Sequence, residues 1–164
     1  MATNLKNLSQ YESERIPDGA GYKISLIVSE WNREITEALA NGAIDTLKKH
    51  GVKNENIAMH WVPGSFELPL GGQMAIQASN PDAVLLLGCV IQGETRHFDF
   101  ICSAVSEGCM NLGLKYNLPV IFGVLTTQNI EQARERAGGL HGNKGTEAAI
   151  TALQMIDLKG RING

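Results

Sequence analysis

The stretch from Gly88 to Asp99 brings together several groups that can do chemistry. It contains a hydroxyl at Thr95, an imidazole at His97 and a carboxylate at Asp99. Backbone amides and a hydroxyl at the start of a helix can hold an anion, and an imidazole can donate or accept a proton near neutral pH. The stretch therefore predicts a site that binds an anion and moves a proton.

The elements around this stretch predict where the site lies. An apolar run over residues 83–87 indicates a buried strand, and residues 98–116 are typical of a helix. In open α/β sheets, ligands bind at the carboxyl ends of the strands, where such strand-to-helix connections lie. The site is therefore expected at a sheet edge.

Along the chain, the pattern of a strand followed by a helix is predicted four times, with the last helix broken in two. Strands are expected over 22–29, 56–62, 83–90 and 119–125, and helices over 32–51, 65–78, 98–116, 130–137 and 145–158. The first helix is expected to have Asn32 as its N-cap and Gly51 as its C-terminal stop. Such alternation predicts an α/β fold in three layers, with a parallel sheet between helices. The segments 29–32, 63–67, 89–97 and 125–128 should then converge at one edge.

Composition narrows the class of protein. The 164 residues are expected to form one domain, over 22–158, between an N-terminal arm (1–21) and a C-terminal tail (159–164). A net charge of −3 argues against a general nucleic-acid or membrane-surface binder. The polar N-terminus and an odd set of cysteines, Cys89, Cys102 and Cys109, favour a reduced, cytoplasmic setting.

Familiar cofactor motifs do not occur. The segment Gly142–Gly145 resembles a phosphate loop in composition but lacks its residue order, and no G-x-G-x-x-G follows the first strand. The histidines have no metal-ligand spacing, so a metal site is not expected.

Each candidate residue also has a purely structural interpretation. Thr95 could cap a helix instead of binding an anion, and His97 could be an ordinary surface histidine. Ser65 could also be a helix cap, with Glu67 in the first turn, although a hydroxyl and a carboxylate beside Phe66 suit a polyol attached to a ring. From the residues alone, both interpretations stay open.

The aromatic and basic candidates are equally ambiguous. Trp31 follows the first strand, so its ring could stack on a flat heterocycle or pack in the core. Arg134 and Arg136 lie on a short predicted helix, where most arginines are solvated and a minority bind anions.

Taken together, the segments from Tyr22 to Leu158 resemble the lumazine synthase family. The resemblance rests on segments that occur in order at matching intervals, namely 29–32, 63–69, 88–99, 122–126, 135–138 and 142–145. It implies a flavodoxin-like fold and a transferase of riboflavin biosynthesis. That enzyme condenses 5-amino-6-(D-ribitylamino)uracil with 3,4-dihydroxy-2-butanone 4-phosphate, giving 6,7-dimethyl-8-ribityllumazine, phosphate and water, without a cofactor.

The resemblance also implies roles for individual residues. The ribitylaminouracil would be bound by Trp31, Ser65, Phe66, Glu67, Cys89, Val90, Ile91 and Phe122. The butanone phosphate would be bound by Glu94, Thr95 and Arg136, with His97 as the catalytic proton donor. Supporting positions would be Asn32, Asp99, Lys144 and Glu147. Trp31 departs from the phenylalanine that is commoner in the family, although a flat ring is kept.

The family resemblance further implies a homo-oligomer. Pentamers are expected, in some members packed as twelve pentamers into an icosahedral capsid, with Phe122 and Arg136 completing the neighbouring subunit's site. The arm would add a strand to a neighbour, and riboflavin synthase is a candidate partner. The short link over 138–142 favours the sixty-subunit shell, although Pro17 in the arm could disturb shell contacts.

Two other functions compete with this one. A non-catalytic lumazine- or flavin-binding or shell-forming protein on the same fold is suggested by Trp31 and opposed by intact Thr95, His97 and Arg136. A flavodoxin-like FMN or phospho-receiver domain is disfavoured by its missing signatures.

Overall fold

The structure, a computed structural model, describes residues 16–164. Most of the arm expected over residues 1–21, including the strand it would add to a neighbour, lies outside the described residues. Among the described helices, none has both the length and the apolar character needed to cross a bilayer.

A sheet of four parallel strands forms the centre of the molecule. The strands are β1 (Ile24–Ser29), β2 (Ile57–Val62), β3 (Ala83–Ile91) and β4 (Val120–Thr127), in the order β2-β1-β3-β4. Every neighbouring pair is parallel. The central strands β1 and β3 are covered on both faces, and for this reason they read as apolar runs instead of alternating patterns.

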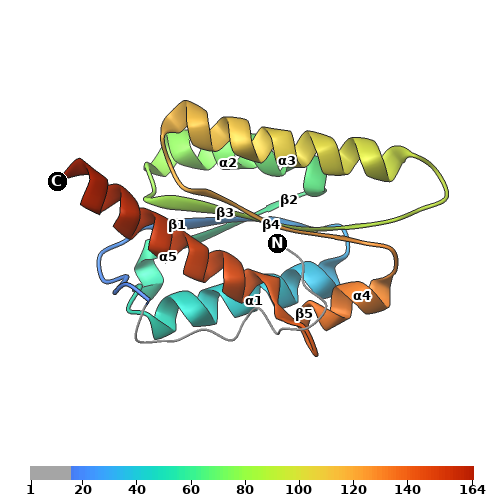
Figure 1. Cartoon of the computed structure of the whole chain (residues 1–164), viewed down its shortest axis with the longest axis horizontal. Helices are drawn as coiled ribbons and strands as arrows, with labels where there is room; N and C mark the ends of the chain where they lie inside the picture. The colour runs from blue at the N-terminus through green and yellow to red at the C-terminus, as the bar shows by residue number, and fades with distance from the viewer. Residues whose placement is uncertain (1–15) are drawn as a thin grey trace.

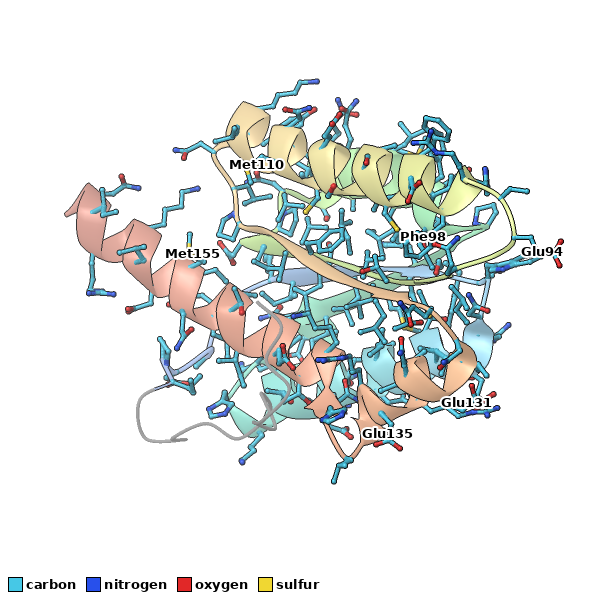
Figure 2. All side chains as sticks on the ribbon, turned by 45° about the vertical axis from the view of Figure 1, so that its right-hand side comes forward. Glu94, Phe98, Met110, Glu131, Glu135 and Met155 are labelled. Atoms are coloured by element: carbon cyan, nitrogen blue, oxygen red, sulfur yellow. The ribbon has the colours of Figure 1, made fainter. Side chains whose placement is uncertain are left out.

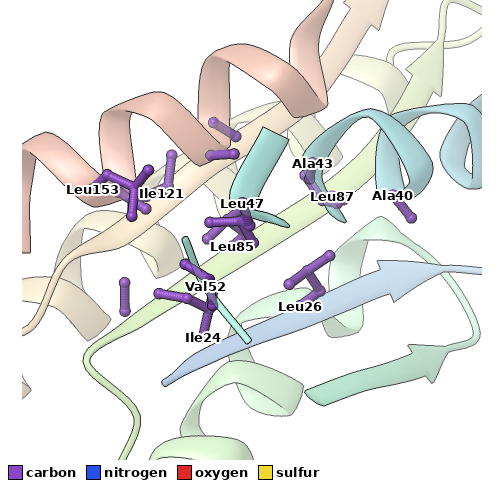
Figure 3. Packing of buried hydrophobic residues seen from close by; sticks show 14 of the residues in the cluster. Ile24, Leu26, Ala40, Ala43, Leu47, Val52, Leu85, Leu87, Ile121 and Leu153 are labelled. Carbon is purple, nitrogen blue, oxygen red and sulfur yellow. The ribbon is translucent and has the colours of Figure 1, made fainter. Parts of the chain in front are cut away.

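Helices cover both faces of the sheet (Figure 1). One layer contains α2 (Leu68–Ser79) and α3 (His97–Tyr116), and the other contains α1 (Arg33–Lys49), α4 (Ile130–Glu135) and α5 (Lys144–Asn163). A buried apolar cluster joins β1 and β3 to α1 and α5, with Leu26, Leu47, Leu85 and Leu153 among its members (Figure 3). The expected flavodoxin-like, three-layer α/β fold is confirmed.

Helix ends follow the turn residues in the sequence. Gly51, expected as a C-terminal stop, has φ 89° just beyond α1, a conformation that glycine adopts at little cost. Asn80 and Asn117 take left-handed conformations at the ends of α2 and α3. Short 3-10 turns, η2 (Asn54–Asn56) and η3 (Ser65–Glu67), precede β2 and α2.

The region between the last two helices differs from the expectation. The glycine-rich link forms a small antiparallel hairpin of β5 (Ala137–Gly139) and β6 (Gly142–Asn143), with positive φ angles at Gly138 and Gly142. The last helix extends to Asn163, so most of the predicted C-terminal tail is helical. The last helix was expected to end at residue 158, because the apolar spacing that marks its buried face ends there.

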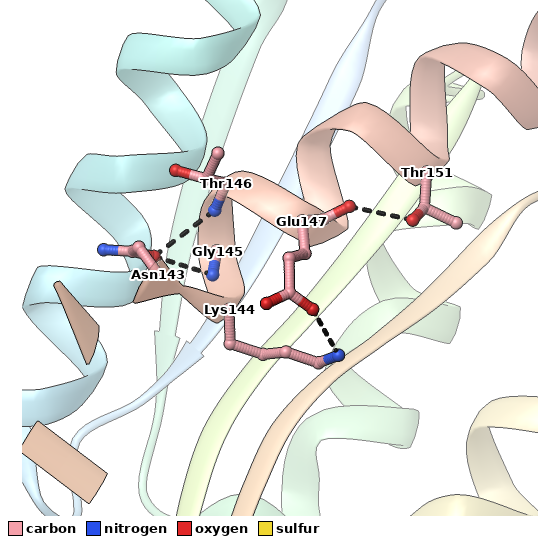
Figure 4. A network of polar contacts seen from close by, with 6 residues as sticks. All are labelled: Asn143, Lys144, Gly145, Thr146, Glu147 and Thr151. Atoms are coloured by element: carbon pink, nitrogen blue, oxygen red, sulfur yellow. Dashed lines mark hydrogen bonds and ion pairs between the residues drawn. The ribbon is translucent and has the colours of Figure 1, made fainter. Parts of the chain in front are cut away.

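The start of α5 is fixed by Asn143 (Figure 4). Its Oδ1 accepts hydrogen bonds from the backbone N–H groups of Gly145 (2.8 Å) and Thr146 (3.3 Å). Its Nδ2 donates to the Ala38 carbonyl at 2.9 Å. One side chain therefore caps α5 and holds it against α1.

Candidate active site at the carboxyl edge of the sheet

The segments that follow the four strands meet at one edge, as predicted. Beyond the ends of β1 and β2, Glu30 N–H donates to the Val62 carbonyl (2.8 Å) and Trp31 N–H to the Pro63 carbonyl (3.2 Å). Beyond β3, Gln92 N–H donates to the Thr127 carbonyl at 2.8 Å. These backbone hydrogen bonds fix the segments that carry most of the candidate residues.

A first cavity of about 660 Å³, here called the Trp31 cavity, opens at this edge. Its volume suits a small organic molecule. It is lined by residues from three of the four predicted edge segments and from α3: Trp31, Asn32, Gly64, Ser65, Phe66, Glu67, Cys89, Val90, Ile91, His97 and Ile101. Eight of these had been predicted as site residues from the three segments, and His97 had been predicted as the proton donor.

Two aromatic rings at the Trp31 cavity are exposed. Trp31 is 72% exposed and Phe66 is 57% exposed, whereas the apolar side chains of β1 and of residues 83–87 in β3 are almost fully buried. Core packing is therefore the wrong interpretation of Trp31. An exposed aromatic pair beside a cavity can stack on a flat heterocycle.

Asn32 and Cys89 join the ends of β1 and β3. Asn32 was expected to cap α1, but its side chain makes no cap hydrogen bond, and its backbone is left-handed with φ 61°. Its Nδ2 instead donates to the Cys89 carbonyl at 2.9 Å. This bond holds the backbone of β3 where it faces the cavity.

The Cys89 side chain is buried in an apolar cluster. It is 1% exposed and packs with Ile35, Leu39, Leu125 and Ala133 in a small apolar cluster. Burial raises the pKa of this thiol to about 12, so the thiol is neutral at physiological pH. Cys89 can therefore contribute its backbone to a ligand but not a thiolate nucleophile.

Ser65 has a different environment from the helix cap that was considered. It lies in η3, is buried, and its Oγ has no hydrogen-bond partner among the described residues. A Cβ added at Gly88 would lie 2.6 Å from this Oγ, so Ser65 packs directly against the glycine of β3. Buried hydroxyls are normally paired, and an unpaired one beside a cavity is a feature of functional sites.

The loop before α3 is exposed and only partly enters the cavity. His97 begins α3, and its backbone N–H donates to Thr95 Oγ at 3.4 Å, so the Thr95 hydroxyl satisfies an amide at the start of this helix. Asp99 pairs with Arg96 at 3.6 Å. Figure 2 shows Glu94 at the outer end of this loop. Of the predicted residues here, only His97 lines the Trp31 cavity, and Glu94, Thr95 and Asp99 do not.

A second, larger cavity of about 1160 Å³, here called the Arg136 cavity, lies on the other side of β4's end. It is lined by residues from β4, α4 and the start of α5, with single residues from other elements: Gln92, Phe98, Phe122, Val124, Leu125, Thr126, Thr127, Gln128, Asn129, Glu131, Gln132, Glu135, Arg136, His141, Lys144 and Glu147. Figure 2 shows Glu131 and Glu135 on α4 at the same end of the molecule as Glu94.

The charged residues of the Arg136 cavity are held in different ways. Lys144 Nζ lies 2.9 Å from Glu147 Oε2, and both side chains are largely buried (Figure 4). Arg136 is half-buried at the C-terminal end of α4, where its carbonyl accepts from Lys144 N–H at 2.9 Å. Its guanidinium makes no ion pair with another described residue, so it can bind an anion.

The two cavities have no lining residue in common. One described chain therefore does not bring His97 and Arg136 into the same cavity. This separation fits a site that two subunits complete together.

Several lining residues were missed by the sequence analysis. Gln92 and Gln128 lie in the segments 89–97 and 125–128, which were expected at this edge, but neither was named as a site residue. His141 reaches the Arg136 cavity only because the glycine-rich link folds back as a hairpin. The part of the chain that the structure describes contains no group of three or more His, Cys, Asp or Glu side chains that could hold a metal ion.

The sheet and its cavities define a flavodoxin-like α/β protein with a small-molecule site at the carboxyl edge. The profile of the 6,7-dimethyl-8-ribityllumazine synthase family matches residues 21–160. The chain belongs to this family, as the resemblance in its sequence predicted.

Curated relatives of the same name match over nearly their whole length. The protein from Cytophaga hutchinsonii is 58% identical over 156 residues, covering 95% of this chain and 98% of its own. That from Porphyromonas gingivalis is 52% identical over 159 residues (97% and 99%), and that from Parabacteroides distasonis is 50% identical over 157 residues (96% and 98%).

Proposed function

We propose that this chain is a transferase of riboflavin biosynthesis. It condenses 5-amino-6-(D-ribitylamino)uracil with 3,4-dihydroxy-2-butanone 4-phosphate and releases 6,7-dimethyl-8-ribityllumazine, phosphate and water. The observation that carries the proposal is the Trp31 cavity, where two exposed aromatic rings, a buried hydroxyl and His97 lie together on the edge that the family's sequence motifs form.

The Trp31 cavity binds the ribitylaminouracil. Trp31 and Phe66 stack on the pyrimidine, the backbone of Cys89, Val90 and Ile91 contacts its polar edge, and the segment Ser65–Glu67 holds the ribityl chain. His97 at the wall of the cavity shuttles protons in imine formation and dehydration, for which an imidazole is suited near neutral pH.

The Arg136 cavity of a neighbouring subunit completes the site. Arg136 binds the phosphate, and its preorganised charge stabilises the departing anion. Phe122 from the same cavity closes over the pyrimidine, with Lys144 and Glu147 at the rim. Glu94 and Thr95 contact the phosphate from the exposed loop, with Asp99 in support. Holding both substrates side by side supplies much of the catalysis.

The proposed assembly follows from the shared site. The subunits form pentamers, and the short link over 138–142 favours twelve pentamers in a shell. Residues 22–158 form the catalytic unit, and the arm over 1–21 adds a strand to a neighbour's sheet. Riboflavin synthase, which would use the lumazine, is a proposed partner, and the cysteine content supports a cytoplasmic location.

The direct test is incubation of the purified protein with both substrates. We expect lumazine fluorescence and phosphate to appear together, without added metal and unchanged by EDTA. Omitting either substrate is the control. Tight binding of lumazine without turnover would instead support the non-catalytic alternative. Loss of activity on chelation, restored by one specific metal, would contradict the cofactor-free reaction.

A further inference from the structure

The short helix α4 has few means of holding a fixed position. It contains only six residues, Ile130–Glu135, and Arg136 follows at its C-terminal end. Its one fully buried side chain, Ala133, packs with Ile35 and Leu39 of α1. Ile130 at the start of α4 is partly buried against the same cluster. Such apolar contacts are not directional, so a directional polar contact can add to the orientation of α4 on α1.

That contact is an ion pair between Arg134 and Glu34 in the first turn of α1. Arg134 Nε donates to Glu34 Oε1 at 2.8 Å and Nη2 donates to Oε2 at 3.1 Å. Two parallel bonds fix the direction of a guanidinium as well as its distance. The hydrogen bond from Arg134 and its charge lower the pKa of the Glu34 carboxyl, so the pair persists at neutral pH.

The geometry distinguishes this pair from others on the surface. The Arg33–Glu37 pair lies on the same helix, spans one turn, and is longer at 3.9 Å. Glu34 and Arg134, by contrast, join two helices that are far apart in the sequence. Arg134 bonds to α1, whereas Arg136, which directly follows α4, lines the Arg136 cavity.

We propose that Glu34 and Arg134 are positioning residues, which orient α4 so that Arg136 reaches the phosphate of the butanone substrate. The inference rests on the proposed function, because it assigns Arg136 to that phosphate. Neither Glu34 nor Arg134 is among the described residues that line the Trp31 cavity or the Arg136 cavity, so both would act through Arg136. Loosening the pair should impair phosphate recognition and leave the Trp31 cavity unchanged.

The test is a double-mutant cycle of Glu34→Gln, Arg134→Gln and the combined variant. We expect each single change to raise KM for the butanone phosphate by about two- to fivefold, the range for an exposed ion pair. The combined variant should raise KM no further than the single variant with the larger increase, because each change removes the same ion pair. Both kcat and binding of the pyrimidine should stay at the wild-type value.

Glu37→Gln is the matched control, since it removes the same charge from the neighbouring turn of α1 and should leave KM unchanged. Three results would overturn the positioning role: additive increases in KM, equal increases for both substrates, or an unchanged KM for the butanone phosphate in all three variants. If Arg136→Ala changes KM while the cycle does not, only this inference fails. If Arg136→Ala also leaves KM unchanged, the phosphate assignment itself is wrong.

Discussion

The Trp31 and Arg136 cavities are built on opposite principles. The Trp31 cavity is formed by the segments at the ends of β1, β2 and β3. Its backbone groups are fixed by hydrogen bonds, such as the one that Asn32 Nδ2 donates to the Cys89 carbonyl. The Arg136 cavity is formed largely by side chains of a short helix, a hairpin and the start of α5, with charged residues throughout. The Trp31 cavity is shaped mainly by strand ends and backbone groups, and the Arg136 cavity mainly by polar side chains on small elements.

This difference suggests a division of labour. A pocket of buried backbone and aromatic rings suits a flat, uncharged heterocycle, and substitutions there should affect both stability and binding. In the Arg136 cavity the Arg136 guanidinium is the group that suits a phosphate, and its substitution should affect mainly the recognition of that anion. The following predictions test that division, from the largest expected effect to the smallest.

The largest effect is expected at the one group assigned to proton transfer. His97→Ala should lower kcat by about 10²–10⁴-fold, the usual range for a general acid or base. Binding of the pyrimidine should change little, because its ring contacts remain. His60→Ala, on an exposed residue of β2 that lines neither cavity, is the control. A variant with unchanged steady-state kcat would remove His97 from the mechanism.

Arg136→Ala should affect the two substrates unequally. A charge-assisted hydrogen bond contributes about 1.5–3 kcal/mol, so use of the butanone phosphate should fall by about ten- to a hundredfold, with little change for the pyrimidine. Added inorganic phosphate should inhibit the wild type and have little effect on the variant. Arg161→Ala, on an exposed arginine of α5, should behave as wild type. Equal losses for both substrates would contradict the division between the cavities.

Gly88→Ala tests whether the Trp31 cavity depends on the core. The new Cβ would lie 2.6 Å from Ser65 Oγ and 2.9 Å from Leu68 Cδ1, which forces neighbouring atoms to move. Overpacking of this kind costs about 1–3 kcal/mol in the free energy of unfolding, and pyrimidine affinity should fall with it. Gly93→Ala is a matched control in the same segment, since no atom lies within 4 Å of its added Cβ. Equal stability of the two variants would refute the close packing.

The smallest effect on activity is expected when thiol reagents are added, because the Cys89 thiol is buried. Its pKa of about 12 means that thiol reagents at pH 7.5 should leave it unmodified in the folded protein and react with it in denaturant. The folded state retains the proton more strongly than the unfolded chain, so this residue's contribution to stability is retained below pH 9 and decreases as the pH rises from 9 toward 12. Mass spectrometry after alkylation measures the outcome, and rapid labelling of native Cys89 would show that the cluster around it is open.

The sequence predicted the Trp31 cavity better than the Arg136 cavity, for a physical reason. β3 is an apolar run that ends at a polar stretch, and in a parallel sheet such ends converge, so Cys89, Ser65 and Trp31 could be placed together. The role of Asn32 could not be predicted, because its partner, the Cys89 carbonyl, is 57 positions away. A cap was the reasonable expectation from local sequence alone.

The Arg136 cavity depends on contacts that no local pattern records. Composition and spacing alone did not distinguish Arg134 from Arg136, and it was the family resemblance that assigned Arg136 to the phosphate. In the structure Arg134 pairs with Glu34, 100 positions away, whereas Arg136 lines the cavity. The hairpin arises from positive φ angles at Gly138 and Gly142, which a glycine permits but does not require. Burial of Ser65 likewise depends on Gly88 of a different strand.

The central claim is that the Trp31 cavity of one subunit and the Arg136 cavity of the next form one active site. The most direct measurement is the activity of mixed assemblies made by dissociating and reassembling His97→Ala and Arg136→Ala proteins together. Under random mixing in equal amounts, about a quarter of the interfaces should pair an intact His97 with an intact Arg136. We predict that lumazine formation rises well above that of either parent assembly. No recovery in assemblies verified as mixed, or full activity in an isolated monomer, would contradict the shared site.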